Sequence, residues 1–141
     1  MPSGNGIAAQ ALCRLGNLVG DARYVEAAER AVRAFLSPDH ASVQCSLLPA
    51  LAELIEPPLV VVLRGPQAEC RAWQAAYEGE YRPHAVIVNA AELPDLPATL
   101  AKPHQGRALA YVCRATTCLA PVEERDALPP LLGNARSARF G

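Results

Sequence analysis

The stretch from Arg107 to Leu132, RALAYVCRATTCLAPVEERDALPPLL, decides how the second half of the chain is expected to fold. Residues 108–112 form an apolar run typical of a buried strand, and a helix led by Pro121 is expected after it. Between the two lies a tight polar turn enclosed by Cys113 and Cys118. Loops that follow strands in open α/β sheets are where ligands bind, so this turn is the first place to look for chemistry.

Two further strands are expected upstream of this stretch. Residues 59–63 (LVVVL) and 85–89 (AVIVN) are short apolar runs rich in β-branched side chains, typical of strands that are buried on both faces. A helix at 69–81 separates them, and a short helical turn at 96–100 precedes the third strand. The alternation of strand and helix predicts a small three-stranded parallel sheet of order 2-1-3 with flanking helices, so residues 58–133 are expected to form an α/β subdomain.

The first half of the chain is expected to be helical. A first helix from Gly6 to Val19 can be capped by Ser3 or Asn5, and Gly20 supplies the left-handed residue that ends it. Asp21 caps a second helix, and the short joint between the two helices predicts an antiparallel hairpin. One face of the first helix is expected to pack inward, because apolar residues recur on it at helical spacing: Ile7, Ala11, Leu15 and Leu18.

A third helix is expected to open at Ser37 and Pro38, after the second ends near Leu36. Pro49 falls inside its apolar pattern, and an interior proline predicts either a kink or a late start. The proline pair at 57 and 58 ends this helix. Residues 1–57 are therefore expected to form one helical segment, ahead of the α/β subdomain.

Composition excludes several classes of function. The chain of 141 residues is 51% hydrophobic and 19% charged, with a net charge of −1. It therefore lacks the excess positive charge that attracts a protein to the phosphates of nucleic acid. It has no apolar run long enough to span a membrane and no secretory signal pattern at its start. The odd count of five cysteines in such a chain predicts a reducing, cytoplasmic location with mostly free thiols.

Cys113 and Cys118 are spaced C-x4-C, which fits neither a C-x-x-C redox centre nor a zinc ribbon. If the link stayed extended, their Cα atoms would lie about 16 Å apart, well beyond the reach of a disulfide. Only a folded-back turn could join them. We therefore expect two structural thiols, with a redox-active disulfide and a metal site as alternatives. No catalytic residue, resident metal or cofactor is predicted.

A possible ligand loop is expected where the turns after the first and third strands flank the switch point of the sheet. Arg64 and Gly65 lie in the first turn, and Arg114, Thr116 and Thr117 lie in the second. The functional interpretation is an anion site built from arginine, hydroxyls and backbone N–H groups. The structural interpretation, which we favour, is that the threonines cap the turn and the glycine only serves to turn the chain.

Four segments resemble one family: PSGNG (2–6), LVGDARYVEAAERAVRAF (18–35), VVVLRGP (60–66) and above all AYVCRATTCLAPVEERDAL (110–128). They look like the C-terminal end of thioredoxin-domain-containing proteins of the spermatogenesis-associated type. That family joins a thioredoxin-like domain to an α/α barrel similar to N-acylglucosamine epimerases and six-hairpin glycosidases, followed by a small α/β tail. The resemblance implies that residues 1–57 are the end of the barrel and that the chain is a fragment; the trailing residues 134–141 are expected to be disordered.

Three functions follow from the pattern and the resemblance. The favoured one is a non-catalytic structural or interaction module whose partner is the remainder of a parent protein, and whose isolated form self-associates through uncovered helix faces. The second is a thiol–disulfide role for Cys113 and Cys118, in exchange with the thioredoxin-like domain. The third is a share in sugar epimerase or glycosidase chemistry of the barrel, which rests on fold analogy alone.

Overall fold

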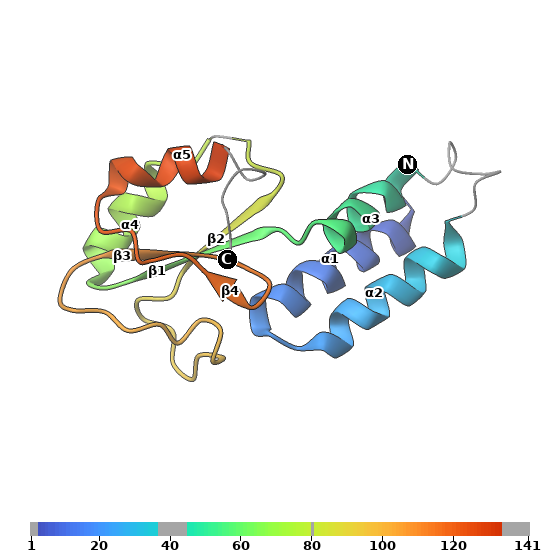
Figure 1. Cartoon of the computed structure of the whole chain (residues 1–141), viewed down its shortest axis with the longest axis horizontal. Coiled ribbons are helices and arrows are strands. Elements are labelled where there is room, and N and C mark those ends of the chain that lie inside the picture. Colours follow the sequence, from blue (N-terminus) through green and yellow to red (C-terminus); the bar gives the residue numbers. More distant parts are fainter. Residues whose placement is uncertain (1–2, 37–44, 80, 134–141) are drawn as a thin grey trace. The chain divides into compact units, whose positions relative to one another are not determined.

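The computed structural model describes residues 3–36, 45–79 and 81–133. The chain forms two compact units, Met1–Pro57 and Pro58–Gly141, and each is described by itself. The first unit is helical and the second contains the sheet (Figure 1). The class is therefore α/β, as the sequence predicts. The expected opening of the third helix at residues 37 and 38 and the expected disorder of 134–141 lie outside the described residues.

The first unit begins with a helical hairpin made of α1 (Gly4–Val19) and α2 (Ala22–Phe35). The Ser3 side chain accepts a hydrogen bond from the Gly6 N–H and so caps α1. Gly20 ends α1 in the left-handed conformation at φ 74°, and the Asp21 carboxylate caps α2 by accepting from the Arg23 N–H. The caps and both helices thus agree with the sequence prediction, because local residue chemistry determines where a short helix starts and stops.

The third helix starts late. The 3-10 turn η2 (Cys45–Leu47) leads into α3 (Leu48–Ile55), which has Pro49 in its first turn. A proline is tolerated there because the N–H that it lacks would have no partner within the helix. Of the two expectations for Pro49, a kink or a late start, the structure has the late start.

Small residues make the inward face of α1. The buried positions of this helix are Gly6, Ala9, Cys13 and Gly16. A Cβ at Gly6 would lie 2.4 Å from the Ser46 carbonyl oxygen, and one at Gly16 would lie 2.6 Å from Val25 Cγ2. The backbones therefore approach more closely than larger side chains would allow. The expected inward face is wrong: Ile7 and Leu15 point to solvent, with 59% and 39% of their surface exposed.

The second unit is built on a four-stranded mixed sheet of order β2-β1-β3-β4. Its strands are β1 (Leu59–Arg64), β2 (Ala85–Asn89), β3 (Leu109–Arg114) and the short β4 (Thr117–Cys118). β1 pairs with β2 in parallel, across the helix α4 (Gln67–Ala75) that connects them. The expected order of the first three strands is correct, but the expected all-parallel, three-stranded sheet is wrong, since β3 runs antiparallel to β1 and β4 adds a fourth strand.

The orientation of β3 follows from the connection that leads into it. Residues 90–108 contain no helix, and three prolines in this segment (Pro94, Pro97 and Pro103) cannot donate the backbone hydrogen bonds of a crossover helix. The expected short helical turn at 96–100 is found as a single turn, in which the Leu100 and Ala101 N–H groups donate to the Pro97 carbonyl, and it does not extend into a helix. The chain returns at the end of the sheet where β2 stops, so β3 runs in the opposite direction.

The two faces of the sheet are covered differently (Figure 1). Odd-numbered residues of β1 form the main core with Cys70, Trp73 and Tyr77, which lie on α4 and just beyond it, and with Leu128 and Leu132 of α5 (Leu128–Gly133). The connection between β2 and β3 lies on the other face, where the Tyr111 hydroxyl donates to the Pro103 carbonyl at 2.6 Å. The expected helix at 69–81 runs from Gln67 to Ala75, and the expected helix after Pro121 is the 3-10 turn η3 (Arg125–Ala127) followed by α5.

Candidate redox site

A two-residue hairpin turn brings the two cysteines of the polar stretch together. Cys113 near the end of β3 lies opposite Cys118 in β4, and a disulfide joins them with a Cα–Cα distance of 3.9 Å. The Leu119 N–H donates to the Val112 carbonyl at 2.9 Å, so the next pair inward is hydrogen-bonded and the cysteine pair is not. Such non-hydrogen-bonded pairs bring their side chains closest.

The expectation of two separate structural thiols is therefore wrong. The calculated separation of about 16 Å assumed an extended link, but the chain folds back at Ala115, which adopts a left-handed φ of 49°. Hairpin turns with positive φ usually carry glycine or asparagine, and ATT carries neither. This hairpin therefore lacks the usual sequence signal.

The two sulfurs lie in different surroundings. Cys113 is 6% exposed, whereas Cys118 is only half-buried in β4, the edge strand of the sheet. The Lys102 ammonium donates to the Cys118 Sγ at 3.4 Å. A positive charge beside a cysteine favours its thiolate over its thiol, and the thiolate is the reactive form in disulfide exchange.

Lys102 is held in place through its backbone carbonyl, which accepts a hydrogen bond from another residue. The Arg64 guanidinium donates from Nε to the Lys102 carbonyl at 3.0 Å, and also to the Ala90 carbonyl. The neighbouring carbonyl, that of Pro103, accepts from the Tyr111 hydroxyl. Both donors lie on the face of the sheet that also carries Cys113, because Arg64, Tyr111 and Cys113 share one side of the pleat. These bonds fix residues 102 and 103 over the sheet, so that the lysine side chain reaches the disulfide.

The expected ligand loop is not assembled. Arg64 pairs with Leu109 and Arg114 pairs with Leu59, so the two turns lie at opposite ends of antiparallel strands. Five residue steps along a strand separate them by about 17 Å. Thr116 and Thr117 stay with Arg114 at the hairpin end.

Arg64 and Gly65 instead have structural roles. The Arg64 guanidinium is engaged with backbone carbonyls, as described above. Gly65 has a φ of 141°, and a Cβ on it would lie 2.4 Å from the Arg107 carbonyl oxygen. The backbone of residues 107 and 108 therefore occupies the space where a side chain at position 65 would lie.

The remaining cysteines differ from this pair. Burial raises the pKa of the Cys13 and Cys70 thiols, which keeps them in the unreactive form, while Cys45 is exposed. Glu53 and Glu69 add to the increases at Cys13 and Cys70, respectively. Within the described residues, no group of three or more His, Cys, Asp or Glu side chains could hold a metal ion.

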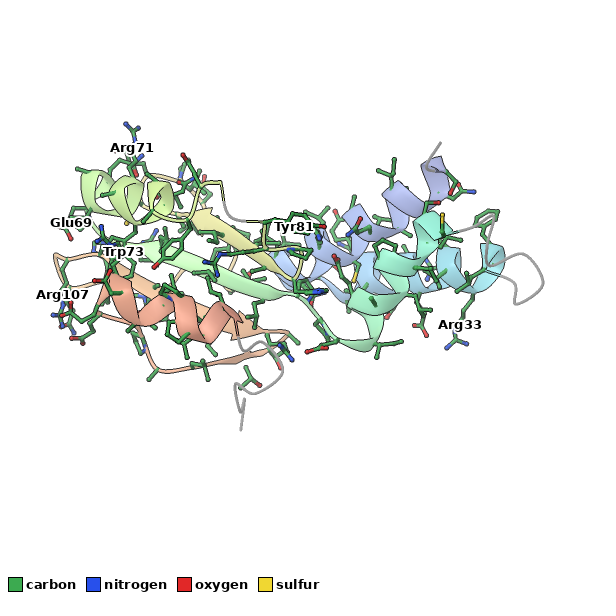
Figure 2. The ribbon with its side chains drawn as sticks, turned by 90° about the horizontal axis from the view of Figure 1, so that it is seen from above. Arg33, Glu69, Arg71, Trp73, Tyr81 and Arg107 are labelled. Carbon is green, nitrogen blue, oxygen red and sulfur yellow. A yellow bond between two sulfur atoms is a disulfide. The ribbon has the colours of Figure 1, made fainter. Side chains whose placement is uncertain are left out.

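A separate cavity of about 320 Å³ lies on the α4 side of the sheet, away from the disulfide. Its lining includes Glu69 and Trp73 of α4 and residues 123–126. Figure 2 shows Glu69, Trp73 and Arg107 gathered at one end of the sheet unit. Arg107 pairs with Glu123 at 2.6 Å, and a Glu69 carboxylate oxygen accepts from the Ala108 N–H at 2.8 Å. These two interactions connect the residues just before β3 to Glu123 and to α4.

Sequence reasoning missed Lys102. One feature of the sequence does distinguish this residue: Lys102 is the only lysine in a chain that contains 13 lysines and arginines in total. Its proximity to Cys118, 16 residues away, depends on the course of the 90–108 connection, which no local pattern predicts.

No protein-family model, no curated protein and no solved structure matches this chain. Among the helices of the described segments, none has the length and apolar character needed to cross a membrane. The geometry around the Cys113–Cys118 disulfide is therefore the main evidence for a functional site.

Proposed function

We propose that this chain is a thiol–disulfide exchange module that takes two electrons from a partner dithiol through Cys113 and Cys118. The observation that carries the proposal is the Lys102 ammonium, 3.4 Å from the Cys118 sulfur. A disulfide with only a structural role has no need of a cation that stabilises the thiolate of its reduced form.

The exchange balances as a dithiol–disulfide reaction. A partner thiolate attacks one sulfur of the disulfide, the bond between the two sulfurs breaks, and the other cysteine leaves as a thiolate. The second partner thiol then loses its proton and attacks the mixed disulfide, which frees the remaining cysteine. The partner ends as a disulfide, this chain ends as a dithiol, and the two protons of the partner thiols pass to the two cysteines.

The proposed compartment and partner agree with this chemistry. We place the protein in the cytoplasm, where glutathione and thioredoxin keep thiols reduced and a disulfide is usually transient, catalytic or redox-sensing. The proposed partner class is a dithiol of the C-x-x-C type, such as the thioredoxin-like domain that the sequence resemblance implies.

A redox titration tests the proposal. The full chain is equilibrated in dithiol/disulfide buffers of graded potential, and its free thiols are alkylated and located by mass spectrometry. We expect the pair to oxidise reversibly with a potential above about −300 mV, within reach of a thioredoxin dithiol at about −270 mV. NADPH consumption coupled through thioredoxin reductase should follow addition of the oxidised chain, and Cys113→Ser should abolish it while Cys45→Ser should not. Free thiols at every potential, or a disulfide that thioredoxin leaves intact, would refute the proposal.

A second candidate function is that of a packing module, and the outward face of α1 favours it. Ile7 is 59% exposed and Leu15 is 39% exposed, on the side of α1 opposite its small inward residues, and Ile55 of α3 is 76% exposed. Apolar side chains repeated along one exposed face usually mark a surface that another segment covers. We propose that the covering segment is the remainder of the parent protein, and that the isolated chain uses this face to self-associate.

Sedimentation velocity over a range of concentrations tests this second function. We expect a concentration-dependent dimer or larger species that Leu15→Glu dissociates. Arg30→Glu serves as the matched control, because Arg30 is exposed on the neighbouring helix and is not part of the apolar face. A monomer at all concentrations, or equal effects of the two variants, would count against the packing function.

A further inference from the structure

We propose that Cys118 is the cysteine that forms the mixed disulfide with the partner, that Cys113 is the thiolate that leaves in this step and the resolving cysteine in the reverse direction, and that Lys102 stabilises the Cys118 thiolate. This assignment rests on the proposed exchange function and adds a direction to it. Three observations carry it: the position of each cysteine in the sheet, the exposure of each sulfur-bearing residue, and the placement of the lysine.

The two cysteines occupy different positions in the sheet order. Cys113 lies in β3, between β1 and β4, and its partner in β1 is Val60. Cys118 lies in β4 at the edge. In a displacement the attacking sulfur approaches along the line of the bond that breaks, from the side opposite the leaving sulfur. Because the bond joins neighbouring strands, that side is the outer side of β4 for Cys118, where the sheet has no further strand among the described residues, and the side of β1 and Val60 for Cys113.

The exposures agree with this topology. Cys113 is 6% exposed, and Cys118 is half-buried. A protein dithiol is a bulky nucleophile, so access to the sulfur limits which cysteine it can attack. Attack at Cys118 breaks the bond to Cys113, and Cys113 leaves as a thiolate that afterwards takes a proton.

Lys102 acts in the second half of the exchange. When the second partner thiolate attacks the mixed disulfide, Cys118 is the leaving group, and a leaving thiolate of lower basicity departs faster. The Lys102 ammonium already lies 3.4 Å from that sulfur. In the reverse direction the same charge keeps Cys118 as the thiolate that attacks a partner disulfide.

The use of lysine at this position is specific. Lys102 is the only lysine of the chain, and every other residue among its 13 lysines and arginines is an arginine. An ammonium is a compact point charge that can approach a single sulfur, whereas a guanidinium is a planar fork suited to carboxylates and phosphates. Arg64 and Tyr111 act as positioning residues, since they bind the carbonyls of residues 102 and 103.

Trapping of the mixed disulfide tests the assignment of the cysteines. A thioredoxin whose second active-site cysteine is replaced by serine is mixed with the oxidised full chain, and the linked peptides are identified by mass spectrometry. We expect linkage at Cys118. Linkage at Cys113 overturns the assignment but leaves the exchange function standing, whereas the absence of any linkage counts against both.

The pH profile of alkylation tests the role of Lys102. In the Cys113→Ser chain, the rate at which iodoacetamide alkylates Cys118 is measured from pH 5 to 10. Replacing the charge with Lys102→Met should lower that rate about tenfold at pH 7 and move the profile to higher pH, and Lys102→Arg should restore part of the loss. Equal profiles for wild-type and Lys102→Met backgrounds overturn the role of the lysine, whatever the outcome of trapping.

Chemical modification gives the same test without a substitution at Lys102. Because the chain has one lysine, acetylation alters the charge only at Lys102 and at the chain's amino terminus, while reductive dimethylation preserves the charge at both. Acetylation should reproduce the effect of Lys102→Met on Cys118, and dimethylation should not. If acetylation and dimethylation have the same effect, the charge is not responsible and the inference fails.

Discussion

Substitution of Gly65 by alanine tests the packing at the end of β1. Gly65 has a φ of 141°, a backbone conformation that side-chain-bearing residues rarely adopt. An added Cβ would lie 2.4 Å from the Arg107 carbonyl oxygen and 2.7 Å from Ala108 Cα. Both contacts are about 1 Å shorter than an optimal separation of roughly 3.5 Å. The obstructing atoms are backbone, and the Ala108 N–H is held by the Glu69 carboxylate at 2.8 Å, so they cannot move aside freely.

The expected loss of stability has two parts. Holding alanine at this φ costs about 1–3 kcal/mol, and relieving the overlap with a fixed backbone costs a further 1–3 kcal/mol or so. Gly65→Ala should therefore lower the free energy of unfolding by about 2–6 kcal/mol. Small domains have only about 5–15 kcal/mol in total, so the variant should be markedly destabilised.

Urea unfolding followed by tryptophan fluorescence measures this loss. Trp73 is the only tryptophan of the chain and is 8% exposed in the core beside β1, so its emission reports on the sheet unit. Gly79→Ala is the matched control, because Gly79 also has a positive φ of 93° but has no atom within 4 Å of an added Cβ. The free energy of unfolding of the control should fall only by about 1–3 kcal/mol, the cost of the backbone conformation. Equal losses in the two variants would refute the clash with residues 107 and 108.

Three further predictions concern buried groups. Glu53→Ala should destabilise the helical unit by about 2–4 kcal/mol, measured by circular dichroism in urea, since this 3% exposed carboxylate accepts hydrogen bonds from a glutamine and an arginine of α1. Thiol reagents should leave Cys13 and Cys70 unmodified in the folded chain until the pH is well above the usual thiol range, because their pKa values are raised; prompt labelling at pH 7 would contradict this. Tyr77→Phe should cost about 1 kcal/mol by removing a 2.6 Å hydrogen bond to a backbone carbonyl of η3, while the control Tyr81→Phe, at a 91% exposed position, should cost nothing measurable.

Local chemistry explains which parts of the fold the sequence could predict. The caps at Ser3 and Asp21 and the left-handed Gly20 depend on residues within one turn of each helix end, and all three are found as expected. The strand at 59–64 is buried along nearly its whole length, which the continuous apolar run already indicates.

Two of the errors depend on contacts between separate elements, and the third depends on a local turn without the usual sequence signal. The inward face of α1 is determined by how closely Ser46 and Val25 approach Gly6 and Gly16, and hydrophobicity alone selects the opposite side of the helix. The direction of β3 depends on a connection of 19 residues, 90–108, that forms no helix. The hairpin at Ala115 has no glycine to mark it, so an extended link was the simpler assumption.

The strand alternation of β3 separates the disulfide from the core, which the proposed exchange requires. Val112 and Ala110 point into the cluster that packs against α4 and α5, whereas Cys113 and Tyr111 lie on the opposite face. The hairpin also has backbone bonds that do not depend on the sulfurs, from the Leu119 N–H to the Val112 carbonyl and between Ala110 and Val122 in both directions. Because these bonds flank the cysteine pair on its inner side, reduction leaves β3 and the segment after β4 joined. The backbone pairing of this hairpin therefore does not depend on the disulfide alone.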